Sequence, residues 1–241
     1  MMVRKNIKRL YRNSWLGVLW TVLNPLLNMF VMVFVFSSFF GRGVDFPTYV
    51  LSGYMTFNFM RGSTTQALSS IVNNRGLINK VKISSFLFPT ADIFTELVSY
   101  GFSFAALLIV LLVRVNTIHL TALFVPVYLL SLMMFSLGLG FLLSALYVYF
   151  RDIKHLYGVF CTLWMYMTPL FWTVTNMSAT VQFFVRFNPM YWYVTVFRDL
   201  MLHGVMPAPM HLLYCFGMGF AMVAIGGLIF NYSKKKFILY I

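Results

Sequence analysis

Residues 120–150 read LTALFVPVYLLSLMMFSLGLGFLLSALYVYF, a run of 31 residues in which no side chain carries a charge. An α-helix rises about 1.5 Å per residue, so about 20 apolar residues cross the hydrocarbon core of a bilayer. The run is longer than one perpendicular crossing needs, and we expect its helix to tilt or to project beyond the bilayer. This stretch predicts a membrane protein built of α-helices.

The composition of the whole chain supports the same class. Of its 241 residues, 61% are hydrophobic and 10% are charged, whereas an average soluble domain carries roughly a quarter charged residues. The 27 Phe, 14 Tyr and 5 Trp exclude a solvated, disordered chain. The length leaves room for about six spans and no sizeable domain outside the membrane. Charge-poor runs place the expected spans at residues 22–40, 46–68, 93–113, 120–148, 156–175 and 208–231.

The net charge of +13 is interpreted through the positions of the basic residues, because basic loops stay on the cytoplasmic side of a membrane. Basic residues crowd the first 12 positions and recur at Lys234–Lys236, so we expect both ends in the cytoplasm. An even number of crossings follows, and it requires the weakly hydrophobic segment 46–68 to cross despite Arg61. In this six-span topology all eight lysines lie on the cytoplasmic side.

Two segments are expected to lie along the membrane rather than through it. Residues 1–18 place apolar side chains on one helical face and basic ones largely on the other, which is typical of a helix in the cytoplasmic interface. Residues 177–203 mix aromatic side chains with Arg186, Arg198 and Asn188-Pro189, and are too broken to span. We expect an outer re-entrant hairpin there, since irregular backbone inside a membrane needs protein or water to satisfy it.

Groups that could carry out chemistry are few. The chain has no phosphate-binding loop, no H-E-x-x-H motif and no G-x-S-x-G elbow. The four histidines are scattered near span ends, where solvation or capping is a better interpretation than metal ligation. Asp92 and Glu96 lie four residues apart, but too near the interface to favour a proton relay. The inventory therefore predicts a conduit or binding body, with no catalytic residue and no metal site.

Arg61 is the one basic residue expected inside a span, where a lone arginine costs at least a few kcal/mol unless it faces a cavity or a partner. One interpretation is an anion contact on a translocation path, for a phosphate or a diphosphate lipid head. The other is a side chain that reaches the interface or pairs with a partner chain. The sequence leaves both open.

Aromatic residues make up 19% of the chain, and belts at the lipid interfaces account for most of them. Flat apolar rings are also what a path for a long glycan needs, although packing is an alternative for any single ring. With Arg61, the candidate substrate path comprises Tyr147, Trp164, Tyr166, Phe171, Trp172, Tyr191 and Trp192.

Several short motifs follow one another along the chain. They are YRNSWLGVLW at 11–20, LNPLL at 23–27, VFS at 35–37, FRDI at 150–153, TPLFW at 168–172, and Asn188-Pro189 followed by FRD at 197–199. The series resembles ABC-2-type permeases, the membrane subunits that export polysaccharides, O antigen and teichoic acid. The resemblance extends from about residue 4 to 231, and its specificity comes from the order, spacing and topology of the motifs together.

The resemblance implies an all-α membrane protein of six transmembrane helices, with an N-terminal interfacial amphipathic helix and outer re-entrant gate helices between spans five and six. It implies a homodimer in the bacterial plasma (inner) membrane, with two copies of a separate ATP-binding cassette subunit. ATP and Mg would bind that partner, so this chain would bind no cofactor and would not itself be an enzyme. The implied substrate is a lipid-linked polysaccharide, such as O antigen, teichoic acid or a capsule-like glycan, and no nucleic acid is involved.

The resemblance also assigns roles to segments. Residues 69–90 would form the loop that couples to the ATP-binding subunit, and the FRD turn would contribute to the same contact. The residues expected in coupling are Arg75, Leu77, Lys80, Arg151 and Asp152. The residues expected at the outer gate are Asn188, Pro189 and Arg198.

Three other functions compete with this one. An ABC-2 exporter of another lipid or of a drug would share the same fold, and the aromatic richness favours a glycan only mildly. An autonomous secondary transporter would show internal repeats with interrupted helices in matching halves, and no convincing repeat is present. A structural membrane subunit without a transport role is the third alternative, against which the hairpin and Arg61 argue weakly.

Overall fold

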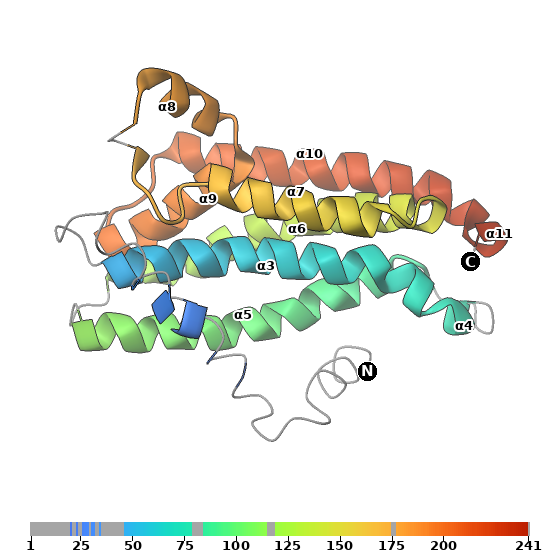
Figure 1. Cartoon of the computed structure of the whole chain (residues 1–241), viewed down its shortest axis with the longest axis horizontal. Coiled ribbons are helices and arrows are strands. Elements are labelled where there is room, and N and C mark those ends of the chain that lie inside the picture. The colour runs from blue at the N-terminus through green and yellow to red at the C-terminus, as the bar shows by residue number, and fades with distance from the viewer. Residues whose placement is uncertain are drawn as a thin grey trace.

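The computed structural model describes residues 46–78, 84–114, 119–174 and 177–240, together with scattered positions between 20 and 34. All the regular structure in these ranges is helical, and the long helices lie side by side in one elongated bundle (Figure 1). The interfacial helix expected at 1–18 and most of the span expected at 22–40 lie outside the described residues.

The described helices fall into four long ones and several short ones. In chain order they are α3 (Phe46–Asn73), α4 (Arg75–Ile78), α5 (Leu87–Arg114), η1 (Leu120–Phe124), α6 (Val125–Tyr149), α7 (Ile153–Met167), α8 (Ala179–Arg186), α9 (Pro189–Arg198), η3 (Asp199–His203), α10 (Pro209–Ser233), η4 (Lys234–Lys236) and α11 (Phe237–Tyr240). Three stretches are long and apolar enough to cross a membrane: Leu87–Leu112, Leu120–Tyr149 and Pro209–Lys236. The all-helical class is therefore confirmed for the described residues, while the six-span topology stays a prediction.

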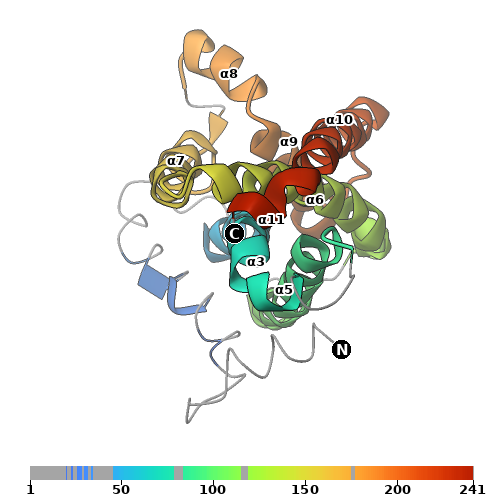
Figure 2. The same cartoon turned by 90° about the vertical axis from the view of Figure 1, so that its right-hand side faces the viewer.

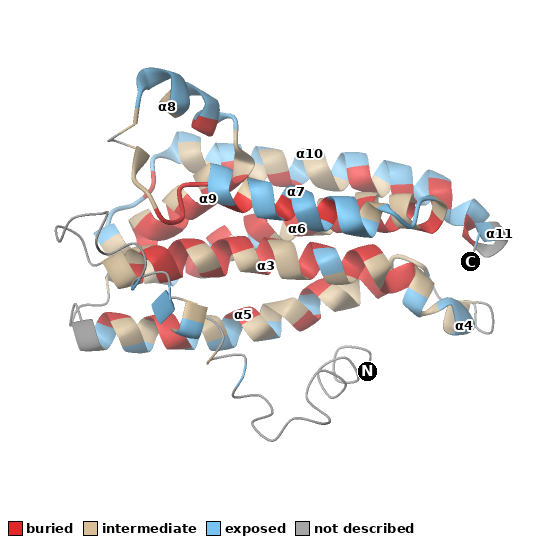
Figure 3. Ribbon diagram, in the orientation of Figure 1, coloured by how far each residue is buried: buried red, intermediate tan, exposed pale blue. Residues whose placement is uncertain are grey.

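Helix α6 is the central helix of the bundle. Of its most apolar window 56% is buried, against 28% for α5 and 17% for α10. Viewed from the end of the bundle, α6 lies between α10 on one side and α3 and α5 on the other (Figure 2). The outward surfaces of α5 and α10 stay apolar although exposed, as at Ile109 and Leu228 (Figure 3). Exposed apolar side chains on a long helix are what contact with lipid requires.

Helices α6 and α10 touch backbone to backbone at a pair of glycines. A Cβ atom on Gly138 would overlap the backbone of Met222, and one on Gly226 would overlap the carbonyl of Gly138. Two turns further along, Gly219 faces the backbone carbonyl of Ser131, with 3.0 Å left for a Cβ atom. Small residues at such crossings let transmembrane helices approach closely, and van der Waals contact then replaces the hydrophobic effect as the attraction between them.

Helix α7 is shorter than the span expected at 156–175. Its 15 residues extend for about 22 Å, and the chain leaves the helix after Met167. Pro169 explains the break, because a proline disfavours the helical conformation of the residue before it and cannot donate a backbone hydrogen bond. The non-helical residues 168–172 carry the chain toward α8 and α9.

The segment 177–203 contains two short helices rather than a span. α8 projects away from the bundle, whereas α9 is packed into it (Figures 1 and 2). The chain after α9 continues into a π-helical turn, η3, and leaves it at Gly204, whose φ of 65° suits a residue without a Cβ atom. The re-entrant placement of this segment within a membrane stays a prediction.

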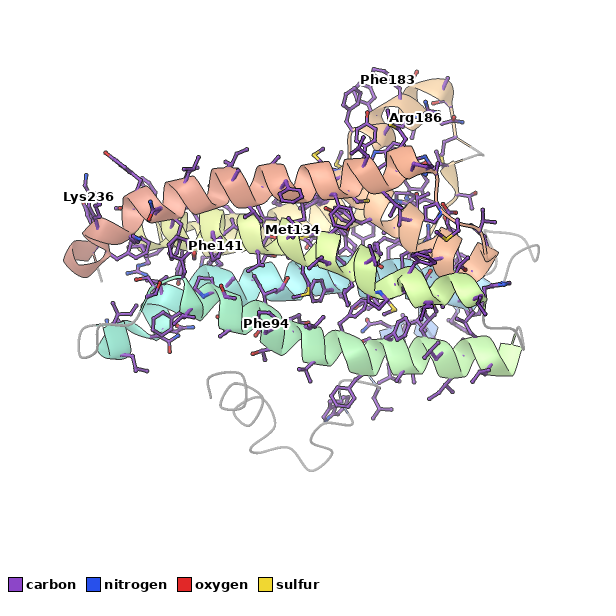
Figure 4. All side chains as sticks on the ribbon, turned by 180° about the vertical axis from the view of Figure 1, so that it is seen from behind. Phe94, Met134, Phe141, Phe183, Arg186 and Lys236 are labelled. Carbon is purple, nitrogen blue, oxygen red and sulfur yellow. The ribbon has the colours of Figure 1, made fainter. Side chains whose placement is uncertain are left out.

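The bundle has two distinct ends. The α8–α9 end contains α8, α9, η3 and the start of α10, and Phe183 and Arg186 project from it (Figure 4). The α4–α11 end contains α4, α11 and the turn between α6 and α7, and Lys236 lies there (Figure 4). The described basic residues of the α4–α11 end are Arg75, Arg151, Lys154, Lys234, Lys235 and Lys236, all exposed. The described lysines therefore all lie at one end of the bundle.

Candidate functional site

A buried arginine organises the α8–α9 end. Arg198, the last residue of α9, is 5% exposed. Its Nη1 atom donates a hydrogen bond to the carbonyl oxygen of Pro169 at 2.9 Å. Its Nη2 atom donates to the carbonyl oxygens of Leu170 at 3.2 Å and Tyr49 at 3.0 Å. The guanidinium therefore joins α9, the broken segment after α7 and the first turn of α3.

The aromatic ring of Tyr49 and a glycine complete this arginine site. The guanidinium carbon of Arg198 lies 3.4 Å from the centre of the Tyr49 ring, a cation–π contact. A Cβ atom on Gly53 would lie 2.6 Å from Nη2, so the glycine gives the guanidinium room to reach its acceptors. Among the described residues Nε of Arg198 is buried without a hydrogen-bond partner. Arginine is always charged and has five donors in a fixed plane, which fits a cluster of carbonyl oxygens.

Asn188 forms a second junction at the same end. Its Oδ1 atom accepts the backbone N–H of Met190 at 3.0 Å and the indole N–H of Trp164 at 2.7 Å. Its Nδ2 atom donates to the hydroxyl of Thr168 at 2.9 Å. Asparagine at the N-cap followed by Pro189 at the first helical position is a favourable start for α9. The three residues expected at the outer gate thus lie on one helix, at its two ends.

Two of the aromatic residues expected on the substrate path are packed inside this chain. Phe171 is 2% exposed. Trp164 makes edge contacts with Phe57 and Phe135, at centroid distances of 6.1 and 6.4 Å, and belongs to the rim of the main hydrophobic core. Their assignment to a path stays a prediction, and within this chain both rings contribute to packing.

The other path candidates are more accessible. Tyr166 is 57% exposed, and its carbonyl oxygen accepts the indole N–H of Trp172 at 3.3 Å. Trp192 is stacked almost parallel on Tyr214 of α10, with 5.4 Å between ring centres and 6° between ring planes. Tyr191 contacts Trp192 edge-on at 4.9 Å. Tyr147 lies far from these rings in the sequence, and the guanidinium of Arg151 lies 5.2 Å from its ring centre.

Polar groups gather along the middle of α3. Arg61 is partly exposed, and its carbonyl oxygen accepts a hydrogen bond from the hydroxyl of Thr64 at 3.2 Å. One turn along, the hydroxyl of Thr64 is hydrogen-bonded to that of Tyr157 at 2.6 Å. These contacts connect α3 with α7 and place Arg61 beside a hydrogen-bonded pair of hydroxyls.

Glu96 of α5 has a partner that sequence reasoning did not find. Its Oε2 atom accepts a hydrogen bond from the Nε2 atom of Gln66 at 2.6 Å. A Cβ atom on Gly62 would lie 2.6 Å from Oε1 of the same carboxyl group. The spacing of Gly62 and Gln66, four residues apart on α3, is the only signal in the sequence, because residues at this spacing share one helical face.

The residues expected in coupling gather at the α4–α11 end, except Lys80, which lies outside the described residues. Arg75 is exposed, and Leu77 is half-buried against the hydrophobic cluster of that end. Arg151 donates to the carbonyl oxygen of Tyr240 at 3.3 Å. Asp152 is the exposed N-cap residue of α7, and its carbonyl oxygen accepts the N–H groups of His155 and Leu156.

Across the described part of the chain, no group of three or more His, Cys, Asp or Glu side chains is placed to hold a metal ion. Cys161 and Cys215 are both buried, and they are free thiols that form no disulfide with each other. The described site consists of junctions between helices, a helix break, and aromatic and basic side chains at the two ends of the bundle.

Comparison with known proteins identifies the class. The sequence profile of the family described as "ABC-2 type transporter" matches residues 1–202, and the chain belongs to this family. It is 27% identical to the O-antigen export system permease protein RfbA of Myxococcus xanthus over 98% of this chain and 92% of that protein. It is 24% identical to the RfbA of Klebsiella pneumoniae with the same coverage. It is also 26% identical to the capsule polysaccharide export inner-membrane protein CtrC of Neisseria meningitidis, over 82% of this chain and 76% of that protein.

Proposed function

We propose that this chain is the permease subunit of an ATP-driven exporter that carries a lipid-linked polysaccharide across the bacterial plasma (inner) membrane. The observation that supports this most directly is the end-to-end similarity to permeases of O-antigen export, together with similarity to a capsule export protein. The family profile and the long apolar helices agree with a membrane subunit of this kind.

The proposal places the α4–α11 end in the cytoplasm. All the described lysines lie there, and basic residues near span ends stay on the cytoplasmic side. With six spans, the N-terminus and the α11 segment would both be cytoplasmic, and the α8–α9 end would face outward. Two copies of the chain would then enclose a path between them.

The energy would come from a separate ATP-binding subunit, present in two copies, on which ATP and Mg would bind. This chain would change no covalent bond. Arg75, Leu77, Lys80, Arg151 and Asp152 would contact the ATP-binding subunit, and its closing and opening would move the helices as rigid groups.

Movement of the glycan would use rings that remain accessible and the arginine on α3. Tyr166 is exposed at the α8–α9 end, where Trp172, Tyr191 and Trp192 are partly exposed, and Tyr147 is partly exposed near the other end. Arg61 would pair with the phosphate groups of the lipid carrier. Arg198, Asn188 and Pro189 would hold α9 against the helix break, which makes α9 the outer gate.

A purification and a deletion strain together test the partner and the substrate class. The tagged chain is gently extracted from its own host, and proteins and lipids that co-purify are identified by mass spectrometry. A P-loop ATPase at about one copy per copy of this chain, with a lipid-linked glycan accumulating inside cells that lack the chain, is the expected result. A stable oligomer with no ATPase in any detergent would refute the proposal, and normal glycan export without the chain would favour another lipid or a drug as substrate.

A further inference from the structure

Four phenylalanine rings form a compact cluster at the α4–α11 end. Phe86, just before α5, lies 5.2 Å from Phe141 of α6 and 4.5 Å from Phe230 of α10. Phe230 in turn lies 5.4 Å from Phe141 and 5.3 Å from Phe237, the first residue of α11. Such ring pairs stabilise beyond the area that they bury. The cluster joins segments that are far apart in the sequence.

Phe237 is the anchor of the segment that follows α10. It is 1% exposed, although the three lysines before it are all exposed. The short η4 turn directs the lysines outward and the phenylalanine ring inward, and Lys234 places its ammonium group 5.2 Å from the centre of the Phe86 ring. A fully buried ring in so short a segment fixes that segment against the bundle.

Residues of the expected coupling loop pack against the same cluster. Ile71 at the end of α3 is part of its buried core, and Leu77 and Ile78 of α4 are packed against it. The backbone N–H groups of Leu77 and Ile78 both donate to the carbonyl oxygen of Asn74, at 2.9 and 3.1 Å. The side chains of Leu77 and Ile78 therefore hold helix α4 against the cluster that contains Phe86, Phe141, Phe230 and Phe237.

The far end of the segment reaches the second expected coupling element. Arg151, in the turn between α6 and α7, donates to the carbonyl oxygen of Tyr240 at 3.3 Å. The ring of Tyr240 lies 4.9 Å from that of Tyr149, and the Tyr149 hydroxyl donates to the carbonyl oxygen of Ser233 at 3.3 Å. Residues 233–240 thus cross the end of α6 and touch the FRD turn.

We infer that residues 234–240 are a strap that joins the two loops facing the ATP-binding subunit, with Phe237 as its positioning residue. The inference rests on the proposed function for the identity of that partner. Through the strap, a displacement of α4 is transmitted to α6, α10 and the turn at Arg151 together. Without it the two loops would move independently, because α4 contains only four residues and has little packing of its own.

The strap is tested with Phe237→Ala in the full chain, compared with Tyr232→Ala as a matched control. Tyr232 is an aromatic residue near the same end of α10 but is 75% exposed. In hydrogen exchange on the purified chain, Phe237→Ala should raise the exchange rates of the Leu77 and Ile78 amides about tenfold, and Tyr232→Ala should leave them unchanged. Protection in α8 should not change in either variant.

The second measurement is made on the complex with its ATP-binding subunit in vesicles. Phe237→Ala complexes should hydrolyse more ATP for each polymer exported, whereas a purely structural role would lower hydrolysis and export in proportion to the amount of complex. If Phe237→Ala does not assemble, Tyr240→Ala, which removes the ring contact with Tyr149, tests the same link at the other end of the strap.

Unchanged exchange at Leu77 and Ile78, or an unchanged ratio of ATP hydrolysed to polymer exported, would overturn the inference. The two failures are separable, because the exchange experiment needs no ATP-binding subunit. If no ATPase ever co-purifies, the proposed function fails while the exchange result still decides whether the segment positions α4.

Discussion

Replacement of Arg198 by alanine is the sharpest test of the α8–α9 end. The variant would remove the guanidinium that joins α9 to the carbonyl oxygens of Tyr49, Pro169 and Leu170. It would also remove the cation–π contact with the Tyr49 ring. The carbonyl oxygen of Tyr49 keeps the hydroxyl of Ser52 as a donor at 2.9 Å, whereas the alanine variant removes the side-chain donor of the Pro169 and Leu170 oxygens.

The expected magnitude follows from these contacts. A buried polar group left without a partner costs about 1–3 kcal/mol, and the carbonyl oxygens of Pro169 and Leu170 are affected here. The loss is partly offset because the variant no longer buries a charge, whose desolvation costs several kcal/mol. We expect a net loss of about 2–4 kcal/mol, which in a chain of this size corresponds to a fall in Tm of roughly 4–16 °C.

The assay is thermal unfolding in detergent. The remaining folded fraction is measured by size-exclusion chromatography, and tryptophan fluorescence is measured in parallel. Arg186→Ala is the matched control, because Arg186 is an exposed arginine at the same end of the bundle. Arg198→Lys should fall between the two, since an ammonium group lacks the planar fork that reaches separate acceptors. If Arg198→Ala unfolds within about 1 °C of the parent chain, the three hydrogen bonds do not hold α9, and the reasoning is refuted.

Three further predictions concern the packing of the bundle. Gly226→Leu should lower Tm sharply or prevent folding, because the new side chain would overlap the backbone of α6. Gly227→Leu should be tolerated, because a Cβ atom at Gly227 meets nothing within 4 Å. Equal expression and equal Tm for the two variants would contradict the glycine contact. Asn188→Ala should cost about 1–3 kcal/mol through loss of the N-cap of α9 and of the Trp164 hydrogen bond, seen as a lower Tm and a shifted tryptophan emission, and an unchanged emission would argue against that bond. Glu96→Gln should keep an acceptor for Gln66 and change Tm by less than about 2 °C, whereas Glu96→Leu should lower Tm more. Identical Tm values for the two variants would show that the hydrogen bond does not stabilise the chain.

The long helices were the part of the fold that the sequence predicted best. Charge-free runs mark where helices contact hydrocarbon, so they located α6 and α10 directly. They do not mark where helices end. α5 begins at Leu87, several residues before the expected span, because Asp92, which ends the charge-free run, does not interrupt the helix. α7 stops at Met167, several residues short of the expected end, because of Pro169.

The candidate site was predictable in outline only. Asn188-Pro189 is a local helix-start signal, so its place at the beginning of α9 could be anticipated. Its bond to Trp164 joins residues 24 positions apart, and no local pattern encodes that pairing. Arg198 binds backbone carbonyl oxygens, which have no sequence signature at all. The matching seven-residue spacings of Ser131 to Gly138 and Gly219 to Gly226 were a usable signal for the contact of α6 with α10.

The glycine contact between α6 and α10 limits how the protein can change shape. Two helices that meet through side chains can shift by exchanging rotamers, but at Gly138 and Gly226 only backbone is present, so there is nothing to rearrange. The two helices should therefore travel as one body through any transport cycle. Deformation is then left to the parts of the chain without such contact, above all the non-helical residues 168–172. Side chains hold this segment: Arg198 binds the carbonyl oxygens of Pro169 and Leu170, Asn188 binds the hydroxyl of Thr168, and Tyr49 binds the carbonyl oxygen of Trp172.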